Sequence, residues 1–341
     1  MGLWSGGFGV DLGTANTVVC HPRRGVVLNE PSVMVVKANG NGQHAPRPLL
    51  VGRAARELTG RTPVGMMTVR PLHDGVITDL ESARAFIVAI LSRVARRPWE
   101  RFRPQAVIGV PAGATALERR ALIEAAEEAG VGRASLIPEP VAGALGSGID
   151  PLDSRAHMVV DVGGGTAEVT GFCFGGILTT GSCRVAGDEM TLALYQHLRQ
   201  QHRIIVGELT AEDLKMQVDG QECKGPLVIE GRDTTTGKPK VVRLQPDEVV
   251  DAIKPTSDGI IQTLTNCLED LPPQAVGDVM HDGLVVFGGG SLLKGFDKLV
   301  EDAFGFPVRQ ADRPLTCVAE GAAICLNRPE VLDAYGGRRK N

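Results

Sequence analysis

One stretch of the chain places an aspartate, three glycines and a threonine directly after an apolar run. Residues 158–162 are apolar except for Asp161, and glycines 163–165 and Thr166 follow. The run predicts a buried strand, and successive glycines predict a turn whose backbone N–H groups can close on an anion. Because residues 169–174 are again apolar without helical period, the turn joins two strands. This argues against a Walker loop or a dinucleotide fingerprint, since both need a helix to follow.

The same arrangement occurs near the start of the chain. Residues 9–20 run from an apolar strand through Asp11, Gly13 and Thr14 into a second apolar strand. Two such hairpins indicate an internal duplication. Facing each other, they would hold a polyphosphate, with Asp11 and Asp161 directed at its Mg²⁺ through water ligands. Either hairpin alone is equally well explained as an ordinary glycine-rich β-turn, whereas the pair is far more specific.

Composition limits the classes of function. The chain has 341 residues, 43% hydrophobic and 22% charged, which is ordinary for a globular protein of two domains. A net charge of −4 and 4% aromatic residues do not suit a nucleic-acid partner, which we exclude. Seven scattered cysteines without a Cys-x-x-Cys pair predict a reduced, cytoplasmic protein. The N-terminus lacks the features of a signal peptide, no apolar run is long enough to span a membrane, and the histidines show no metal-ligand spacing.

Strands and helices alternate between the two hairpins. The patterns predict helices over 79–95 and 114–129, strands at 105–110 and 135–137, and a small-residue helix over 141–146. This alternation is typical of a mixed α/β sheet with helical cover. After the second hairpin we expect helices starting at 187 and 210, a β-hairpin over 226–242, a helix over 246–268, a strand over 283–287, and a helix over 292–304 that begins at glycines 288–290.

These motifs resemble those of the actin and heat-shock-chaperone ATPase superfamily, and within it the MreB family of bacterial actin homologues. Three motifs in the right order, at 11–17, 161–166 and 288–291, carry the likeness to the superfamily. The likeness to the MreB family is denser and covers nearly the whole chain, with matching segments at 12–17, 29–32, 60–63, 70–77, 185–190 and 314–319.

The resemblance implies an actin-like ATPase fold, an α/β protein whose two duplicated mixed-sheet domains have a nucleotide cleft between them. By analogy, the core of domain I takes residues 1–37, 64–145 and 312–341, and its outer subdomain takes 38–63. The core of domain II takes residues 146–181 and 245–311, and its outer subdomain takes 182–244.

The resemblance also implies ATP and Mg²⁺ as cofactors and assigns catalytic roles to Glu139, Asp161 and Thr166. Glu139 matches the carboxylate that orients the attacking water, and Thr166 matches the hydroxyl near the γ-phosphate. Phosphoryl transfer through a loose transition state depends more on the position of the attacking water than on its activation by a base. A carboxylate held beside Pro140 is suited to positioning that water. Alone, Glu139 is equally compatible with a surface carboxylate in a proline-bounded turn. The implied nucleotide-binding residues are Asp11, Gly13, Thr14, Ala15, Asn16, Gly163, Gly164, Gly165, Thr166, Gly187, Asp188, Glu212, Lys215, Gly288, Gly289, Gly290 and Ser291.

Three positions depart from the family pattern. Ala167 replaces a second threonine, Phe287 replaces a threonine before the triple glycine, and Thr191 replaces an aspartate. The loss of a hydroxyl beside the γ-phosphate predicts slower hydrolysis with nucleotide binding retained.

Aromatic and basic residues predict a membrane contact. Five arginines in residues 93–103 surround Trp99 and Phe102, and Leu3, Trp4 and Phe8 lie near the N-terminus. Aromatic tips with basic neighbours are what an anchor on anionic lipid requires, so we predict that these five residues contact the inner face of the cell membrane. The alternative is that the rings pack on the domain.

Proteins of the resembled family polymerise into membrane-bound filaments that organise cell shape and wall synthesis. The implied partners are therefore further copies of this chain, an anionic membrane and membrane proteins of wall synthesis. One alternative is a filament that positions an organelle or plasmid. Others are a chaperone-type ATPase, which needs a substrate-binding domain after the last ATPase element, and a small-molecule kinase, which needs a phosphoryl acceptor site.

Overall fold

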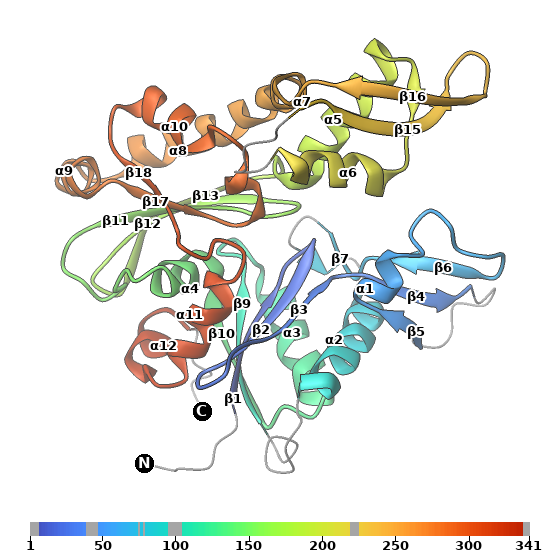
Figure 1. Ribbon diagram of the computed structural model, residues 1–341. Helices are drawn as coiled ribbons and strands as arrows, with labels where there is room; N and C mark the ends of the chain where they lie inside the picture. Colours follow the sequence, from blue (N-terminus) through green and yellow to red (C-terminus); the bar gives the residue numbers. More distant parts are fainter. Residues whose placement is uncertain are drawn as a thin grey trace.

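Two stacked lobes make up the computed structural model, which describes residues 7–38, 47–73, 76–77, 79–94, 104–218 and 225–336 (Figure 1). Each lobe is built on a five-stranded sheet, with strand order β10-β9-β1-β2-β3 in the first lobe and β13-β12-β11-β17-β18 in the second. In each sheet an antiparallel hairpin is extended on one side by an antiparallel strand and on the other by two parallel strands. The predicted duplication and mixed-sheet fold are therefore confirmed.

The first sheet carries the N-terminal hairpin. Its strands are β1 (Gly7–Leu12), β2 (Asn16–His21), β3 (Gly25–Pro31), β9 (Gln105–Val110) and β10 (Arg133–Pro138). Helices α2 (Leu80–Val94) and α3 (Ala116–Glu128) bury their apolar faces against one side of it. Thr115 and Glu118 form a capping box that fixes the start of α3 after the loop that follows β9.

The second sheet repeats this plan. Its strands are β11 (His157–Val162), β12 (Ala167–Cys173), β13 (Gly176–Cys183), β17 (Leu284–Phe287) and β18 (Val308–Gln310). Helices α8 (Ser257–Asp270), α9 (Pro273–Asp282) and α10 (Phe296–Phe304) lie on the side of this sheet that faces away from the first lobe (Figure 1).

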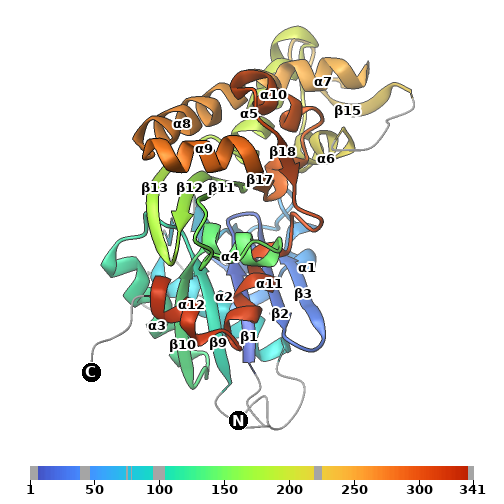
Figure 2. The same cartoon turned by 90° about the vertical axis from the view of Figure 1, so that its left-hand side faces the viewer.

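Two helices of small residues pack between the sheets. These are α4 (Glu139–Gly146) and α11 (Cys317–Cys325), which α12 (Pro329–Tyr335) follows (Figure 2). A Cβ added at Gly146 would lie 1.9 Å from the carbonyl oxygen of Cys317, and one at Gly321 would lie 1.8 Å from that of Ala142. The backbones of α4 and α11 therefore touch, and only glycine allows the contact. Apolar residues of both sheets join this core, so the lobes are packed together at their base.

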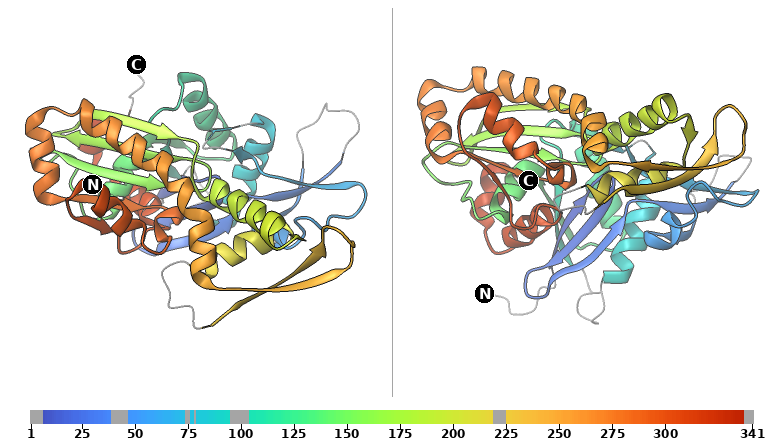
Figure 3. Two further views of the ribbon diagram at one scale, coloured as in Figure 1. Left: turned by 90° about the horizontal axis from the view of Figure 1, so that it is seen from above. Right: turned by 45° about the horizontal axis from the view of Figure 1, so that its top comes forward.

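Two small sheets lie at the same end of the molecule, one on each lobe (Figure 3). The first has β4 (Met34–Lys37) between β5 (Pro48–Val51) and β6 (Met66–Val69), with α1 (Arg53–Arg56) beside it. The second has β15 (Leu227–Asp233) between β14 (Ile204–Ile205) and β16 (Pro239–Leu244), beside α5 (Gly187–Gln201) and α6 (Glu208–Gln217). A two-stranded ribbon pairs β7 (Leu72–His73) with β8 (Val76–Ile77). The subdomain boundaries stay a prediction.

The bounds of several predicted helices differ from those observed. The segment expected as one helix over 246–268 is α7 (Pro246–Ile253), a 3₁₀ turn over Lys254–Thr256, and α8, because Pro255 lacks an N–H for the helical ladder. Helix α6 begins at Glu208 and not at residue 210. Helix α10 begins at Phe296, since Gly289–Leu292 is a 3₁₀ turn and Gly295 has a left-handed backbone. The prediction that this helix starts at the triple glycine was therefore wrong.

No helix within the described ranges is long and apolar enough to cross a bilayer.

Candidate nucleotide site

The two predicted glycine turns face each other across the gap between the lobes. A Cβ added at Gly164 in the second turn would lie 2.9 Å from the Cβ of Ala15 in the first. Ser32 supports the first turn, because its Oγ donates a 2.6 Å hydrogen bond to the carbonyl of Gly13 and its N–H bonds the carbonyl of Ala15 at 2.9 Å. These contacts leave the inner surface of each turn directed into one cleft.

This cleft encloses about 230 Å³ and gathers nearly all of the predicted residues. Two of them do not line it. Gly165 is buried, and Ser291 is buried with its Oγ donating to the carbonyl of Gly288 at 2.8 Å. The predicted residues that do line the cleft are Asp11, Gly13, Thr14, Ala15, Asn16, Glu139, Asp161, Gly163, Gly164, Thr166, Gly187, Asp188, Glu212, Lys215, Gly288, Gly289 and Gly290.

The N-terminus of α5 meets the second turn. The N–H of Gly187 donates to the carbonyl of Gly163 at 3.1 Å, and that of Asp188 donates to the carbonyl of Gly164 at 2.7 Å. No side chain caps the helix. The positive end of the helix dipole therefore lies beside the glycine turn, where it favours an anion in the cleft.

Lys215 is buried and organises the junction of α5 and α6. Its ammonium donates to the carbonyl of Gly187 at 2.8 Å, to Thr191 Oγ1 at 2.9 Å and to Glu212 Oε2 at 2.8 Å. The Thr191 hydroxyl also contacts the Glu212 carboxylate. Thr191, where the family pattern has an aspartate, thus takes part in a satisfied buried network, and all three N–H donors of Lys215 are used within the protein.

The triple glycine packs directly on Asp161. Gly288 has a φ of 83°, and a Cβ there would lie 2.5 Å from Asp161 Oδ1 and 2.4 Å from the carbonyl oxygen of Val162. Any other residue would collide with the strand end and be strained in this conformation. Phe287, which precedes it, is buried against α4, and a Cβ added at Gly143 would lie 2.2 Å from its ring. The side chain of Phe287, which replaces the threonine of the family pattern, therefore fills space between the lobes.

Four carboxyl groups meet at the floor of the cleft. They belong to Asp11, Glu139, Asp161 and Glu168. Burial raises the pKa of Asp11 and of Glu168 to about 7. Burial, and then the neighbouring carboxylates, raise the pKa of Glu139 and of Asp161 well above the usual range. Packing four acids this closely is unfavourable unless protons or a cation neutralise them.

Glu168 was not among the predicted site residues. It is 4% exposed and accepts a 3.2 Å hydrogen bond from the N–H of Ala112. The antiparallel register places it opposite Asp161, so both side chains leave the sheet on the same face. The sequence could have predicted this position, because the turn between the two strands of the hairpin places Glu168 opposite Asp161.

The donor set fits a hard divalent cation. Carboxylate oxygens are the protein ligands that Mg²⁺ takes, and it commonly completes its shell with water and phosphate oxygens. Asp11 and Asp161 lie next to the last residues of β1 and β11, which belong to the two different sheets, and both side chains are partly exposed. Glu139, in the first turn of α4, stands near them, and β9 makes room for it with Gly109, where a Cβ would lie 3.0 Å from Glu139 Cγ.

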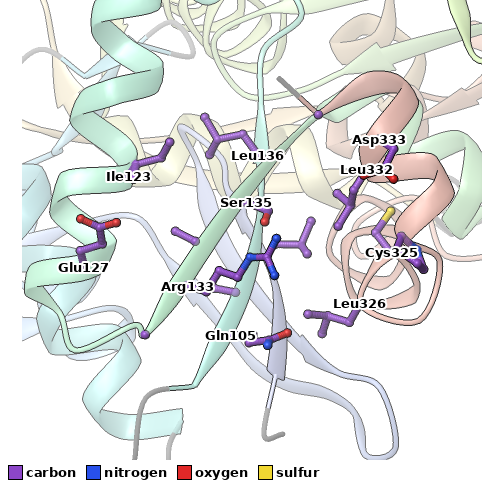
Figure 4. Close-up of a pocket in the computed structure, with 16 residues that line it drawn as sticks. Gln105, Ile123, Glu127, Arg133, Ser135, Leu136, Cys325, Leu326, Leu332 and Asp333 are labelled. Carbon is purple, nitrogen blue, oxygen red and sulfur yellow. The ribbon is translucent and has the colours of Figure 1, made fainter. Parts of the chain in front are cut away.

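A larger cavity of about 1110 Å³ lies elsewhere, between α3 and α12 along the edge strand β10 (Figure 4). Arg133 and Ser135 of β10 line it, together with Leu332 of α12. None of the glycine turns borders it. The chemistry expected from the sequence therefore belongs to the smaller cleft between the lobes. The predicted membrane residues Leu3, Trp4, Trp99 and Phe102 lie outside the described residues. Phe8 lies on β1 and is 2% exposed in the core of the first lobe, so its predicted membrane contact was wrong.

The duplicated sheets, the facing glycine turns and the acid-lined cleft define an actin-like protein. Chains from two solved structures of MreB5 of Spiroplasma citri superpose on it with TM-scores of 0.87 for the AMPPNP-bound form and 0.88 for the ADP-bound form, at 32% and 31% identity. Each covers 96% of this chain and 97% or 98% of its own. A chain of the MamK double helical filament shares the fold, with a TM-score of 0.78, 24% identity, and coverage of 94% of this chain and 98% of its own.

Sequence comparison identifies the family. The model of the MreB/Mbl protein family matches residues 5–334. The cell shape-determining protein MreB of Escherichia coli K12 is 36% identical over 341 aligned residues, which cover 98% of this chain and 96% of that protein. The chain belongs to the MreB/Mbl family.

Proposed function

We propose that the protein binds Mg²⁺-ATP in the cleft between its lobes, hydrolyses it, and assembles into a homopolymeric cytoskeletal filament. The observation that carries the proposal is the pair of glycine turns that face each other above four carboxyl groups. Backbone N–H groups of both turns and the N-terminus of α5 suit a polyphosphate, and the carboxylates suit its divalent cation. The related MreB5 structures hold AMPPNP and ADP, which supports the same class of ligand here.

The residues of the cleft have separate roles in the proposed hydrolysis. Glu139 holds the attacking water in line with the γ-phosphate, and Thr166 donates a hydrogen bond to that phosphate. Asp11 and Asp161 are the residues that would hold Mg²⁺, which when bound would supply positive charge to neutralise the phosphate oxygens. Because Ala167 supplies no second hydroxyl, we expect slow hydrolysis, suited to a filament whose subunits change state after assembly.

The test compares wild type with Asp161→Ala by calorimetry and by sedimentation. Wild type should bind ATP in a Mg²⁺-dependent manner and pellet after ATP addition, whereas the variant should lose most of its affinity and stay in the supernatant. Asp302→Ala, at an exposed position on α10, is the matched control and should behave as wild type. Equal ATP affinity in Asp161→Ala would contradict the proposed site. ATP turnover without any pelleting would favour a small-molecule kinase.

The proposed setting is the cytoplasm, at the inner face of the cell membrane, where the filament organises cell-wall synthesis and cell shape with membrane proteins. The name of the E. coli relative supports a role in cell shape. A filament that positions an organelle or plasmid is the alternative, and loss of rod shape on depletion of the protein distinguishes the two.

Membrane attachment is proposed to use Leu3, Trp4, Trp99 and Phe102. Each arginine near an anionic surface contributes roughly 1 kcal/mol, so a monomer binds weakly, whereas a filament repeats the contact and gains avidity. We expect co-sedimentation with anionic liposomes in ATP, loss of binding at high salt, and strong loss in a Trp99→Ala, Phe102→Ala double variant that still polymerises. Undiminished binding by that variant would leave the N-terminal residues as the anchor.

A further inference from the structure

Two histidines and a glutamate that lie far apart in the sequence meet where α5 ends and α7 begins. His197 Nε2 lies 2.9 Å from Glu248 Oε1, and His202 Nε2 contacts the same oxygen. The three ligand atoms all lie within 4.8 Å of one another, and within the described ranges this is the one group of His, Cys, Asp and Glu with that property. We propose that His197, His202 and Glu248 bind a divalent transition-metal ion, with Zn²⁺ the best match.

The chemistry of the three ligands selects the kind of metal. Two imidazoles and one carboxylate suit Zn²⁺, Co²⁺ or Ni²⁺, whereas Mg²⁺ prefers oxygen ligands alone. Three protein ligands of this composition leave a fourth position for water, as in open zinc sites. The cluster is distinct from the nucleotide cleft, because none of its members lines that cleft.

The geometry needs only a small rearrangement. Zinc bonds of about 2.0–2.2 Å in a tetrahedron place ligand atoms roughly 3.4 Å apart. Both nitrogen–oxygen separations are now shorter than that value, and all three ligand atoms lie within 4.8 Å of one another. Each imidazole now directs Nε2 at the carboxylate oxygen. Because a carboxylate oxygen only accepts hydrogen bonds, each Nε2 now carries the donated proton, so on metal binding each neutral ring would shift its proton to Nδ1 and offer the Nε2 lone pair to the ion.

Rigid surroundings hold the three side chains. Next to His197 and Glu248 in the sequence, Leu198 and Val249 are almost fully buried in the core of the second lobe. His202 is the C-cap of α5, and its carbonyl accepts a 2.7 Å hydrogen bond from Lys240 Nζ. The next residue, Arg203, has a φ of 49°, an uncommon value for a residue other than glycine, and it turns the chain away from the helix. The side chains of the three ligands remain a quarter to a third exposed, so an ion can enter.

A bound ion would join the end of α5 to the first turn of α7. Helix α5 begins at the glycine turn of the nucleotide cleft, and α7 follows the hairpin β15–β16. The ion would therefore fix the outer part of the second lobe to its core.

The test uses the full chain without an affinity tag and without ATP, and it adds Zn²⁺ or Co²⁺ alone. We expect one ion per chain, a melting temperature that rises with Zn²⁺, and Co²⁺ absorption without the intense thiolate charge-transfer band that cysteine ligands would produce. His197→Gln, His202→Gln and Glu248→Gln should each weaken Zn²⁺ binding at least about 10-fold, the lower end of what loss of even an outer-shell partner costs. His281→Gln, which removes an exposed histidine bonded to Asp282, should bind as wild type.

Two results would overturn the proposal. One is a His197→Gln, His202→Gln double variant that keeps wild-type affinity, which would move the metal to another part of the chain. The other is wild-type protein with no saturable Zn²⁺ binding, which would show that the cluster serves only as a pair of hydrogen bonds. Circular dichroism of the metal-free variants separates loss of binding from loss of the fold.

Discussion

At the scale of single residues, the position of Glu139 suits the role proposed for it in hydrolysis. It is the first residue of α4, between Pro138 and Pro140, so its backbone is fixed on both sides. Its carboxyl group stands near those of Asp11 and Asp161, and burial together with these charges raises its pKa. Such a group places a water molecule well, because it has little freedom to turn away.

Replacing Glu139 by Ala should therefore separate binding from hydrolysis. We expect the variant to bind ATP nearly as well as wild type and to hydrolyse it about 10²-fold or more slowly, within the range for loss of a positioned catalytic group. Its filaments should persist after assembly. Phosphate release measured alongside Glu127→Ala, an exposed glutamate of α3, provides the control. A wild-type rate in Glu139→Ala would exclude the assigned role.

At the scale of elements, two hairpins and one helix gather the acids. Asp11 and Asp161 lie near the ends of β1 and β11, Glu168 lies on β12, and Glu139 starts α4. Each element is formed by its own local pattern, but the repulsion between the carboxylates arises only when the elements pack. The nucleotide-free protein should therefore be sensitive to pH.

The direction in which stability changes with pH follows from the pKa of Asp11. Burial raises the pKa of Asp11 from 3.8 to about 7, so the folded state binds a proton more tightly than the unfolded chain does. The resulting stability is present below the unfolded pKa and is lost as the pH rises through about 7. We expect the melting temperature of the nucleotide-free protein to fall as the pH rises from about 4 to about 7 and to level off above that, and Asp11→Asn to reduce that fall because the amide does not titrate. Mg²⁺-ATP should oppose the fall in wild type. An unchanged pH profile in Asp11→Asn would show that this carboxyl group is ionised throughout.

At the scale of the whole molecule, ion pairs connect the outer ends of the two lobes across the cleft. Arg56 of α1 pairs with Asp213 of α6 at 2.7 Å. Arg70, just after β6, pairs with Glu208 at the start of α6 and lies 3.8 Å from Asp188 at the start of α5. These pairs are about a third to a half exposed, so each adds only ~0–1 kcal/mol to stability. We expect these pairs to act mainly on how readily the lobes separate.

Removing Arg70 should accelerate nucleotide release while leaving the fold intact. We expect Arg70→Ala to raise the dissociation rate of a fluorescent ATP analogue by up to about fivefold, which corresponds to ~1 kcal/mol, with little change in melting temperature. Arg84→Ala is the matched control, because Arg84 forms a similarly exposed pair with Glu128 within one lobe. Equal release rates in the two variants would show that the cross-cleft pairs do not hold the lobes closed.

The sequence by itself determined the features that arise from neighbouring residues. Alternation of apolar residues, the Asp-x-Gly-Thr turn at 11–14 and the triple glycine at 163–165 act over a few positions, so they predict the two hairpins, most helices and the duplication. The family motifs then predicted the actin-like fold, and the structure confirms it. The first residues of the helices were predicted less accurately than the presence of the helices. Residue 210 looked like a helix cap, but α6 begins at Glu208.

Tertiary structure alone decided which distant residues meet. Glu168 joins the acids through the register of β11 and β12. The ammonium of Lys215 donates to Gly187 and Thr191 of α5 and to Glu212 of α6, so its three donors are used within the protein. The histidines showed no metal spacing, yet the packing of α5 against α7 brings His197 and His202 onto Glu248. Local patterns specify backbone conformation within one element, whereas distances between elements follow from how their apolar faces pack. That packing depends on side chains throughout the chain.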